Sequence, residues 1–362
     1  MTTNDRELFF SLIRVATGSE SALPYAPSKE EWSRLHTEAQ RQALLGVLYD
    51  GVERLPQGQL PPKATRLLWY TEAERISEAN KRLDEASALV SRRLREEGFR
   101  NAILKGQGNA LLYPSPSRRQ PGDIDVWLEG GREKVISYVL SLFPGERVQW
   151  LELDFPVLRD IPVEAHTAPS VLFCPKDNQR LQAFYREREE ETFTNETPLA
   201  SGTVCLPRWE MNAVFQLTHI YRHLFFEGVG LRQVMDYHYL LLSPEATAER
   251  RQAVREHAKR MHLTRFTGAL MWVLREVFHL EESLLLTAPD QREGSFLLQE
   301  IMLAGNFGHD DERNKPKASR WGNFWQITLR NTRFLAHYPR EVLWNPVYRL
   351  RQYAWRKARG YK

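Results

Sequence analysis

Residues 122–126 read Gly-Asp-Ile-Asp-Val, and the interpretation of the fold starts from this stretch. The apolar residues Ile124 and Val126 alternate with Asp123 and Asp125, which is the period of a β-strand. Residues two apart in a strand point to the same face, so the two carboxylates converge. Like charges repel each other there unless a cation lies between them, and hard cations such as Mg²⁺ prefer carboxylate oxygens. A solvent-facing strand with two capping acids is the alternative.

A third acid lies in a second predicted strand, residues 162–166, which reads Pro-Val-Glu-Ala-His. Glu164 is flanked there by apolar residues, and a third carboxylate beside the aspartate pair would complete a site for two metal ions. His166 is close enough to orient Glu164, or is a structural histidine. The sequence therefore predicts that Asp123, Asp125 and Glu164 meet and hold a divalent cation, Mg²⁺ or Mn²⁺.

The pattern of helical and strand signals changes at three points along the chain. We predict a helical region, an α/β core, a second helical domain and a basic, aromatic-rich end, over residues 1–98, 99–206, 207–312 and 313–362. The fold class is α+β, a mixed sheet flanked by helical regions.

Hydrophobic periodicity and capping residues locate the elements. Predicted helices cover 5–17, a stretch from Ser28 to Leu48, a long segment from Pro61-Pro62 to Gly98, 109–113, 132–143, 207–226, 231–242, 245–260, 264–279 and 290–304. Predicted strands cover 102–104, 124–128, 148–153, 155–159, 162–166 and 203–206. A polar loop is predicted over 305–323.

Composition excludes several classes of protein. The 362 residues are 42% hydrophobic, but no run of about 18 uncharged residues exists, which argues against a transmembrane segment. The N-terminus lacks the pattern of a signal peptide, and two cysteines are too few for a disulfide scaffold. We expect a cytoplasmic protein, with peripheral membrane association as an option.

Charge is divided unevenly along the chain. Residues 313–362 carry thirteen Lys or Arg and one acid, Glu341, whereas the rest of the chain carries 37 basic and 45 acidic residues. Such a basic, aromatic-rich end docks onto the acidic body, lies on an anionic membrane surface or binds RNA. The docked arrangement is the simplest of the three.

Several ordered motifs resemble one known family. They are Ile103-Leu104-Lys105-Gly106, Leu111-Leu112-Tyr113-Pro114, Arg118-Arg119, the stretch 122–126 and Val163-Glu164-Ala165-His166. Together they are similar to a broad bacterial family of uncharacterised nucleotidyltransferases within the DNA polymerase β-like superfamily. The superfamily's usual Gly-Ser motif is replaced here by Lys105-Gly106-Gln107-Gly108, a version found in toxin-type branches.

The resemblance implies roles for these residues. Asp123, Asp125 and Glu164 would bind the metal ions and act in catalysis, with Glu164 helping to deprotonate an acceptor hydroxyl. Nucleotide binding would fall to the Lys-Gly turn and the arginines, that is, to Lys105, Gly106, Gly108, Arg118 and Arg119. A solvated lysine, a plain turn and solvated arginines are the structural alternatives.

A helix over 208–227 carries a polar stripe on an otherwise apolar surface. Gln216, His219, His223 and Glu227 lie at helical spacing, which indicates a cleft wall or a hydrogen-bonded internal network. No HExxH glutamate accompanies the histidines, so a zinc site is not indicated. The resembled family has a histidine-rich helix followed by an aspartate, here Asp236, which adds to the cleft wall.

The leading hypothesis is a Mg²⁺-dependent transferase that moves NMP from an NTP such as ATP to an acceptor hydroxyl and releases pyrophosphate. The acceptor is a small molecule, a glycan precursor, a protein side chain or a tRNA end. A toxin-like enzyme that modifies tRNA is the second hypothesis. A non-catalytic nucleotide-binding or scaffold module is the third.

Overall fold

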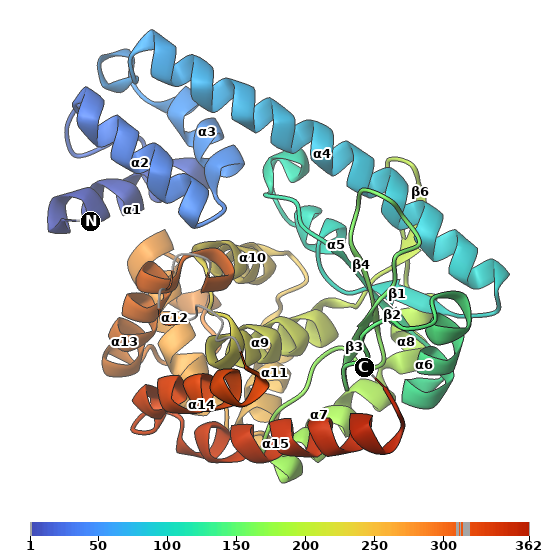
Figure 1. Ribbon diagram of the computed structural model, residues 1–362. Helices are drawn as coiled ribbons and strands as arrows, with labels where there is room; N and C mark the ends of the chain where they lie inside the picture. Colours follow the sequence, from blue (N-terminus) through green and yellow to red (C-terminus); the bar gives the residue numbers. More distant parts are fainter. Residues whose placement is uncertain (1, 309–310, 312, 314–318, 362) are drawn as a thin grey trace.

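The computed structural model describes residues 2–308, 311, 313 and 319–361 (Figure 1). The fold is α+β, as predicted, with one small mixed sheet among many helices. Part of the loop predicted over 305–323, namely 309, 310, 312 and 314–318, lies outside the described residues, and its last residues, from Arg320, are helical.

The N-terminal region is helical, as expected. Helices α1 to α4 cover Thr3–Thr17, Lys29–Arg41, Leu45–Arg54 and Lys63–Glu96, with a short 3-10 turn, η1, at Gln57–Gln59. The single helix predicted from Ser28 to Leu48 is wrong. Ala43 adopts a φ of 54°, which helical backbone does not allow, and the chain therefore turns between α2 and α3.

The sheet has four strands in the order β1-β2-β4-β3. The strands are Asn101–Ile103, Ile124–Leu128, Glu152–Asp154 and Val163–His166, for β1, β2, β3 and β4 in turn. β2 and β4 are parallel, whereas β1 and β3 pair antiparallel at the two edges.

One face of the sheet is an apolar core. Ile124 and Val126 of β2 pack there with Val163 and Ala165 of β4, against α6 (Gly131–Leu142) and the C-terminal half of α4. Side chains alternate along a strand, so the opposite face carries the other set, which includes Asp125 and Glu164. The apolar set therefore aims the carboxylates away from this core.

Two of the predicted strands differ from the structure. The strand expected over 148–153 is confined to Glu152–Asp154, because the chain reverses between Val148 and Leu153, which form an isolated bridge. The strand expected over 155–159 is absent from the described backbone. Phe155 still donates to the Val163 carbonyl, but Pro156 has no N–H to continue the ladder.

The remaining elements complete the α/β part. The motif loop holds α5 and the 3-10 turn η2, at Gln107–Ala110 and Pro116–Arg118. After β4 come two helices that the sequence analysis left out, α7 (Pro175–Glu187) and α8 (Glu189–Thr194). A separate hairpin follows, β5 at Glu196–Leu199 and β6 at Gly202–Cys205.

The C-terminal helices lie beside the sheet (Figure 1). Helices α9 to α13 cover Trp209–Phe226, Leu231–Leu242, Ala248–Arg260, Thr264–Phe278 and Gln291–Ala304, with 3-10 turns η3 at Glu282–Leu284 and η4 at Asn306–Gly308. The chain ends with α14 (Arg320–Asn331), the turn η6 (Thr332–Phe334) and α15 (Pro339–Ala358). None of the helices in the described part of the chain combines the length and apolar character that a membrane span requires.

Candidate active site

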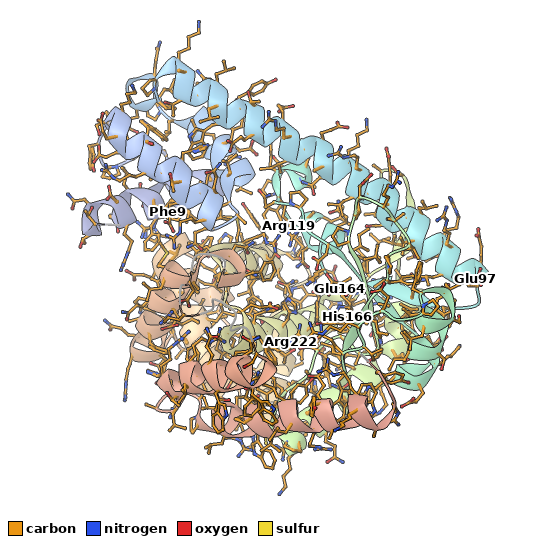
Figure 2. The ribbon with its side chains drawn as sticks, in the orientation of Figure 1. Phe9, Glu97, Arg119, Glu164, His166 and Arg222 are labelled. Carbon is orange, nitrogen blue, oxygen red and sulfur yellow. The ribbon has the colours of Figure 1, made fainter. Side chains whose placement is uncertain are left out.

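Asp125 and Glu164 lie side by side. They are register partners on the parallel strands β2 and β4, so both carboxylates project from the polar face of the sheet. His166 follows two residues after Glu164 on the same face (Figure 2). One ligand atom from each of these three side chains lies within 4.8 Å of the others, which is close enough to hold a metal ion.

Asp125 is the most buried member of this cluster, with a side chain that is 0% exposed. Its Oδ1 atom lies 3.1 Å from Lys105 Nζ and 2.9 Å from His166 Nε2. Its Oδ2 atom has no hydrogen-bond partner among the described residues, although it is buried. A buried oxygen without a partner is costly, and a cation coordinated there would satisfy it.

Two basic groups balance the acids. Burial raises the pKa of Asp125, but the charges of Lys105 and His166 outweigh it and hold that pKa below its usual range. Burial likewise lowers the pKa of His166, yet the neighbouring carboxylates win and raise it to about 10. Burial also lowers the pKa of Lys105, but the carboxylates around it outweigh burial and raise that pKa above its ordinary value. Cations therefore already neutralise this face in part.

Glu164 differs from Asp125 in its electrostatics. Burial, together with repulsion by Asp125 and Glu152, raises the pKa of Glu164, while His166 opposes the shift. Its side chain remains 31% exposed, and His166 Nε2 lies 3.7 Å from Oε2. Glu164 is therefore the more accessible of the two cross-strand carboxylates.

Asp123 lies at the rim of the cluster. It precedes β2, its side chain is 32% exposed, and its Oδ2 atom lies 4.0 Å from Lys105 Nζ. The tightest group thus contains His166 where the sequence analysis placed Asp123. Lys105 lies within 4.0 Å of Asp123 and 3.1 Å of Asp125 and so links the two aspartates.

Two residues that the sequence analysis did not single out complete this face. Glu152 of β3 is the register partner of His166, and its Oε2 atom lies 3.9 Å from His166 Nε2. Arg222 of α9 reaches the same carboxylate at 3.4 Å (Figure 2). Burial raises the pKa of Glu152, but the charges of Arg222 and His166 outweigh burial. The pKa is therefore below its usual value, and Glu152 stays ionised. This contact brings α9 against the polar face of the sheet.

The two histidines of α9 pack against each other. The rings of His219 and His223 are 4.2 Å apart, and burial is the main cause that lowers the pKa of each. The charges of Arg222 and Lys105 lower both pKa values further. His223 Nδ1 also lies 2.7 Å from Glu227 Oε2. The structure thus gives this part of the helix two neutral imidazoles.

Gln216 belongs instead to an internal network. Its amide nitrogen donates to Asn109 of α5 at 3.0 Å and to Asn212 at 3.1 Å. Asn109 in turn donates to Asp236 of α10 at 3.2 Å. The polar stripe of α9 therefore divides: Gln216 belongs to this network, whereas His219 and His223 pack against each other and His223 contacts Glu227.

The two glycines of the motif have different surroundings. Gly106 precedes α5 with a φ of 60°, a conformation that favours glycine, and an added Cβ would lie 3.5 Å from the Asp123 carbonyl. Gly108 packs against the β6–α9 connection, since a Cβ there would lie 2.9 Å from Leu206. Gly106 thus permits the sharp turn, and Gly108 permits close packing.

The two arginines of the motif are held by acids of the helical regions. Arg118 lies 3.3 Å from Asp50 and 2.9 Å from Glu74. Arg119 forms a two-pronged pair with Asp236, with Nε and Nη2 at 2.7 and 2.8 Å from the two carboxylate oxygens. The Tyr113 hydroxyl donates to the same carboxylate at 2.6 Å. These contacts fix the loop that leads into Asp123.

A small mixed sheet with converging carboxylates, set between helical regions, is the arrangement expected of a nucleotidyltransferase-like protein. Residues 28–142 and 157–279 match the family model described as uncharacterised nucleotidyltransferase, and the chain belongs to this family. No curated protein matches the chain. Among solved structures, it is similar to an antigenic nucleotidyltransferase-like protein from Paracoccidioides brasiliensis. That likeness has 14% identity and a TM-score of 0.31, over 55% of this chain and 93% of the other.

Proposed function

We propose that the protein transfers NMP from an NTP to an acceptor hydroxyl and releases pyrophosphate, with Mg²⁺ or Mn²⁺ as cofactor. One observation carries the proposal. Asp125 presents a buried, unpartnered Oδ2 atom beside Glu164 on a face that also holds Lys105. A pair of carboxylates, one of which has a buried oxygen without a hydrogen-bond partner, is a set of ligands that fits a hard divalent cation. Family membership supports the same class of reaction.

Asp123, Asp125 and Glu164 are the residues that would hold the ions. When bound, the ions would offset the charge that builds on the attacking and leaving oxygens. Lys105, 15% exposed and between the two aspartates, would place a positive charge at the triphosphate. Glu164 would accept the proton of the acceptor hydroxyl. The hydroxyl oxygen would then bond to the α-phosphorus as the bond from that phosphorus to pyrophosphate breaks.

The other predicted residues take supporting roles in this proposal. Gly106 lets the backbone turn beside Asp123, and His166 orients Asp125 through its 2.9 Å contact. The neutral rings of His219 and His223 would form the wall beside the acceptor. The acceptor itself is a small molecule, a glycan precursor, a protein side chain or a tRNA end.

Label transfer tests the proposal directly. The full chain is incubated with each NTP, labelled on the α- or on the γ-phosphate, with Mg²⁺ or Mn²⁺ and cell extract. We expect transfer of the α-label only, and none after removal of divalent metal. Asp125→Asn should reduce transfer at least about a hundredfold, because several kcal/mol of charge stabilisation would be lost. Asp160→Asn, an exposed acid in the loop before β4, is the matched control and should retain transfer.

The outcomes separate the hypotheses. A product that is sensitive to RNase indicates an RNA acceptor such as a tRNA end, which the Lys105-Gly106 motif favours. Tight NTP binding with no transfer to any extract indicates a sensor or scaffold and overturns the catalytic proposal. Equal activity of Asp125→Asn and the wild type overturns the assignment of the site.

A further inference from the structure

The two C-terminal helices each expose an apolar stripe. On α14, Trp321, Trp325 and Leu329 recur at one helical face and are 62%, 57% and 65% exposed. On α15, the exposed large apolar residues are Leu343, Trp344, Val347, Leu350 and Tyr353, with Leu343 the most open at 64%. The two helices are neighbours, since Arg349 of α15 donates to the Phe324 carbonyl of α14 at 3.0 Å. Figure 1 shows α14 and α15 beside each other, so the two stripes lie on neighbouring helices.

The inner sides of the same segment are packed firmly onto the body. Phe334, Tyr338 and Val342 are buried, and Trp150 of the α/β part stacks on Tyr348 and Trp355. These contacts match the docked arrangement considered for the basic end. Docking accounts for one side of the helices only, and it leaves the stripes uncovered.

The segment that carries the stripes is strongly basic, although Arg340 and Arg359 pair with Asp177 and Glu133 of other elements. The segment 313–362 holds thirteen basic residues and a single acid. That acid, Glu341, is only 4% exposed and accepts backbone N–H groups of Phe173 and Cys174. In the described part of this segment, exposed basic residues such as Arg351 and Lys357 therefore face solvent with no exposed acid of the segment beside them. Such a surface favours an anionic partner.

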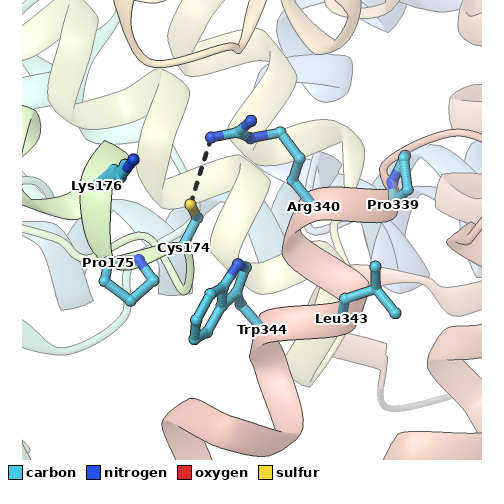
Figure 3. A pocket seen from close by; sticks show the side chains of 7 residues that line it. All are labelled: Cys174, Pro175, Lys176, Pro339, Arg340, Leu343 and Trp344. Atoms are coloured by element: carbon cyan, nitrogen blue, oxygen red, sulfur yellow. Dashed lines mark hydrogen bonds between the residues drawn. The ribbon is translucent and has the colours of Figure 1, made fainter.

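A pocket adjoins the stripe of α15. It has a volume of about 400 Å³ and is lined by Cys174, Pro175, Lys176, Pro339, Arg340, Leu343 and Trp344 (Figure 3). Leu343 and Trp344 belong to the stripe, whereas Lys176 and Arg340 bring positive charge; Arg340 also pairs with Asp177 at 3.0 Å. The pocket thus combines apolar walls with cations at the edge of the stripe.

We propose that the face formed by these stripes binds an anionic phospholipid bilayer. Tryptophan and leucine on one side of a helix, with Lys and Arg flanking them, suit the boundary between headgroups and acyl chains. RNA fits this face less well, because Leu329, Leu343, Val347 and Leu350 offer no ring for a base to stack on. In this arrangement the cations of the pocket lie where they meet headgroup phosphates. The protein is a peripheral membrane protein that leaves its carboxylate site, on the sheet, outside the lipid contact.

Vesicle sedimentation of the full chain tests this proposal. The vesicles contain phosphatidylcholine alone, or phosphatidylcholine with about one third phosphatidylglycerol. We expect binding at least about tenfold stronger to the anionic vesicles, and weaker binding as salt rises from about 0.1 to about 0.5 M. Leu329→Gln with Leu343→Gln should weaken binding at least about tenfold.

The matched control is Leu67→Gln with Leu68→Gln on α4, where the leucines are 61% and 47% exposed. This pair should bind vesicles like the wild type, and circular dichroism verifies that both variants fold. Equal binding to neutral and anionic vesicles, or equal loss in both variants, overturns the proposal. Retention on RNA without vesicle binding also overturns it. Dimerisation through this face in place of lipid binding overturns it as well. In that case the wild type is a dimer that does not bind vesicles, and of the two variants only the Leu329/Leu343 variant is monomeric.

Discussion

Removing the charge of Asp236 should destabilise the fold strongly. Asp236 and Arg119 are 6% and 4% exposed at the side chain and form a two-pronged ion pair between α10 and the motif loop. Tyr113 and Asn109 donate to the same carboxylate. Asp236→Asn keeps the shape of the side chain but leaves the guanidinium of Arg119 buried without a counter-charge.

The structure sets the size of this effect. Loss of one partner from a buried ion pair costs about 3–5 kcal/mol, because the remaining charge is isolated from water. Arg232 should increase this cost, because it is a second buried cation near Arg119. Burial is the main cause that lowers the pKa of Arg232, and repulsion by Arg119 adds to the shift. With Asp236 neutral, two buried cations would face each other without an acid between them. We therefore expect Asp236→Asn to lower the free energy of unfolding by about 3–5 kcal/mol.

A surface pair provides the control. Arg66 grips Glu53 in the same two-pronged way, at 2.7 Å for both contacts, but their side chains are 42% and 36% exposed. Glu53→Gln should cost no more than about 1 kcal/mol, because water screens the charges. The two substitutions thus test burial at constant geometry.

Urea unfolding followed by far-ultraviolet circular dichroism measures both effects. Arg119→Met and the double variant Arg119→Met/Asp236→Asn complete a double-mutant cycle, with an expected coupling of about 2 kcal/mol or more. If Asp236→Asn costs no more than Glu53→Gln, or if the two single effects simply add, then the pair does not anchor the motif loop.

Two further predictions concern other parts of the fold. Burial raises the pKa of Glu341 from 4.5 to about 7, so the folded state holds this proton more tightly, and stability falls by about 3 kcal/mol as pH rises between those values. Glu341→Gln should flatten that part of the curve of unfolding free energy against pH, and an unchanged slope would contradict the assignment. Gly46→Ala should destabilise the protein by about 1–3 kcal/mol in urea unfolding, because its Cβ would overlap the Arg118 carbonyl oxygen. Gly58→Ala, with no atom within 4 Å of the added Cβ, should leave stability within about 0.5 kcal/mol of the wild type.

The central part of the site could be predicted because it depends on local periodicity. Alternation along residues 122–126 identified β2, and Glu164 between apolar neighbours identified β4. Once two strands pair in parallel with their apolar residues on one face, their acids must share the other. This requirement excludes shifts by one residue, and the structure selects the register that pairs Asp125 with Glu164.

Other elements depend on features that periodicity does not contain. The apolar pattern from Trp32 to Leu48 continues through the turn at Ala43, where the positive φ ends one helix and begins the next. Residues 155–159 form a short, mainly apolar run like a strand, but a strand also needs a partner, and Pro156 cannot donate to one. Pattern alone therefore overestimates how far helices and strands continue.

The least predictable part of the site is its electrostatic balance, because it joins distant segments. Glu152 meets the same criterion as Glu164, an acid between two buried apolar residues, and this signal could have identified it. Its partner Arg222 lies on α9, 70 residues further along the chain, and nothing in the local sequence marks that contact. Arg119 and Asp236 are likewise 117 residues apart. The sequence analysis predicts nucleotide binding for Arg119 and a cleft-wall position for Asp236, and it did not anticipate that the two side chains form an ion pair with each other. Of the motif cations, Lys105 is the one that contacts Asp123 and Asp125 directly, and the contacts of Arg119 and Arg118 with acids of other segments could not be read from the motif.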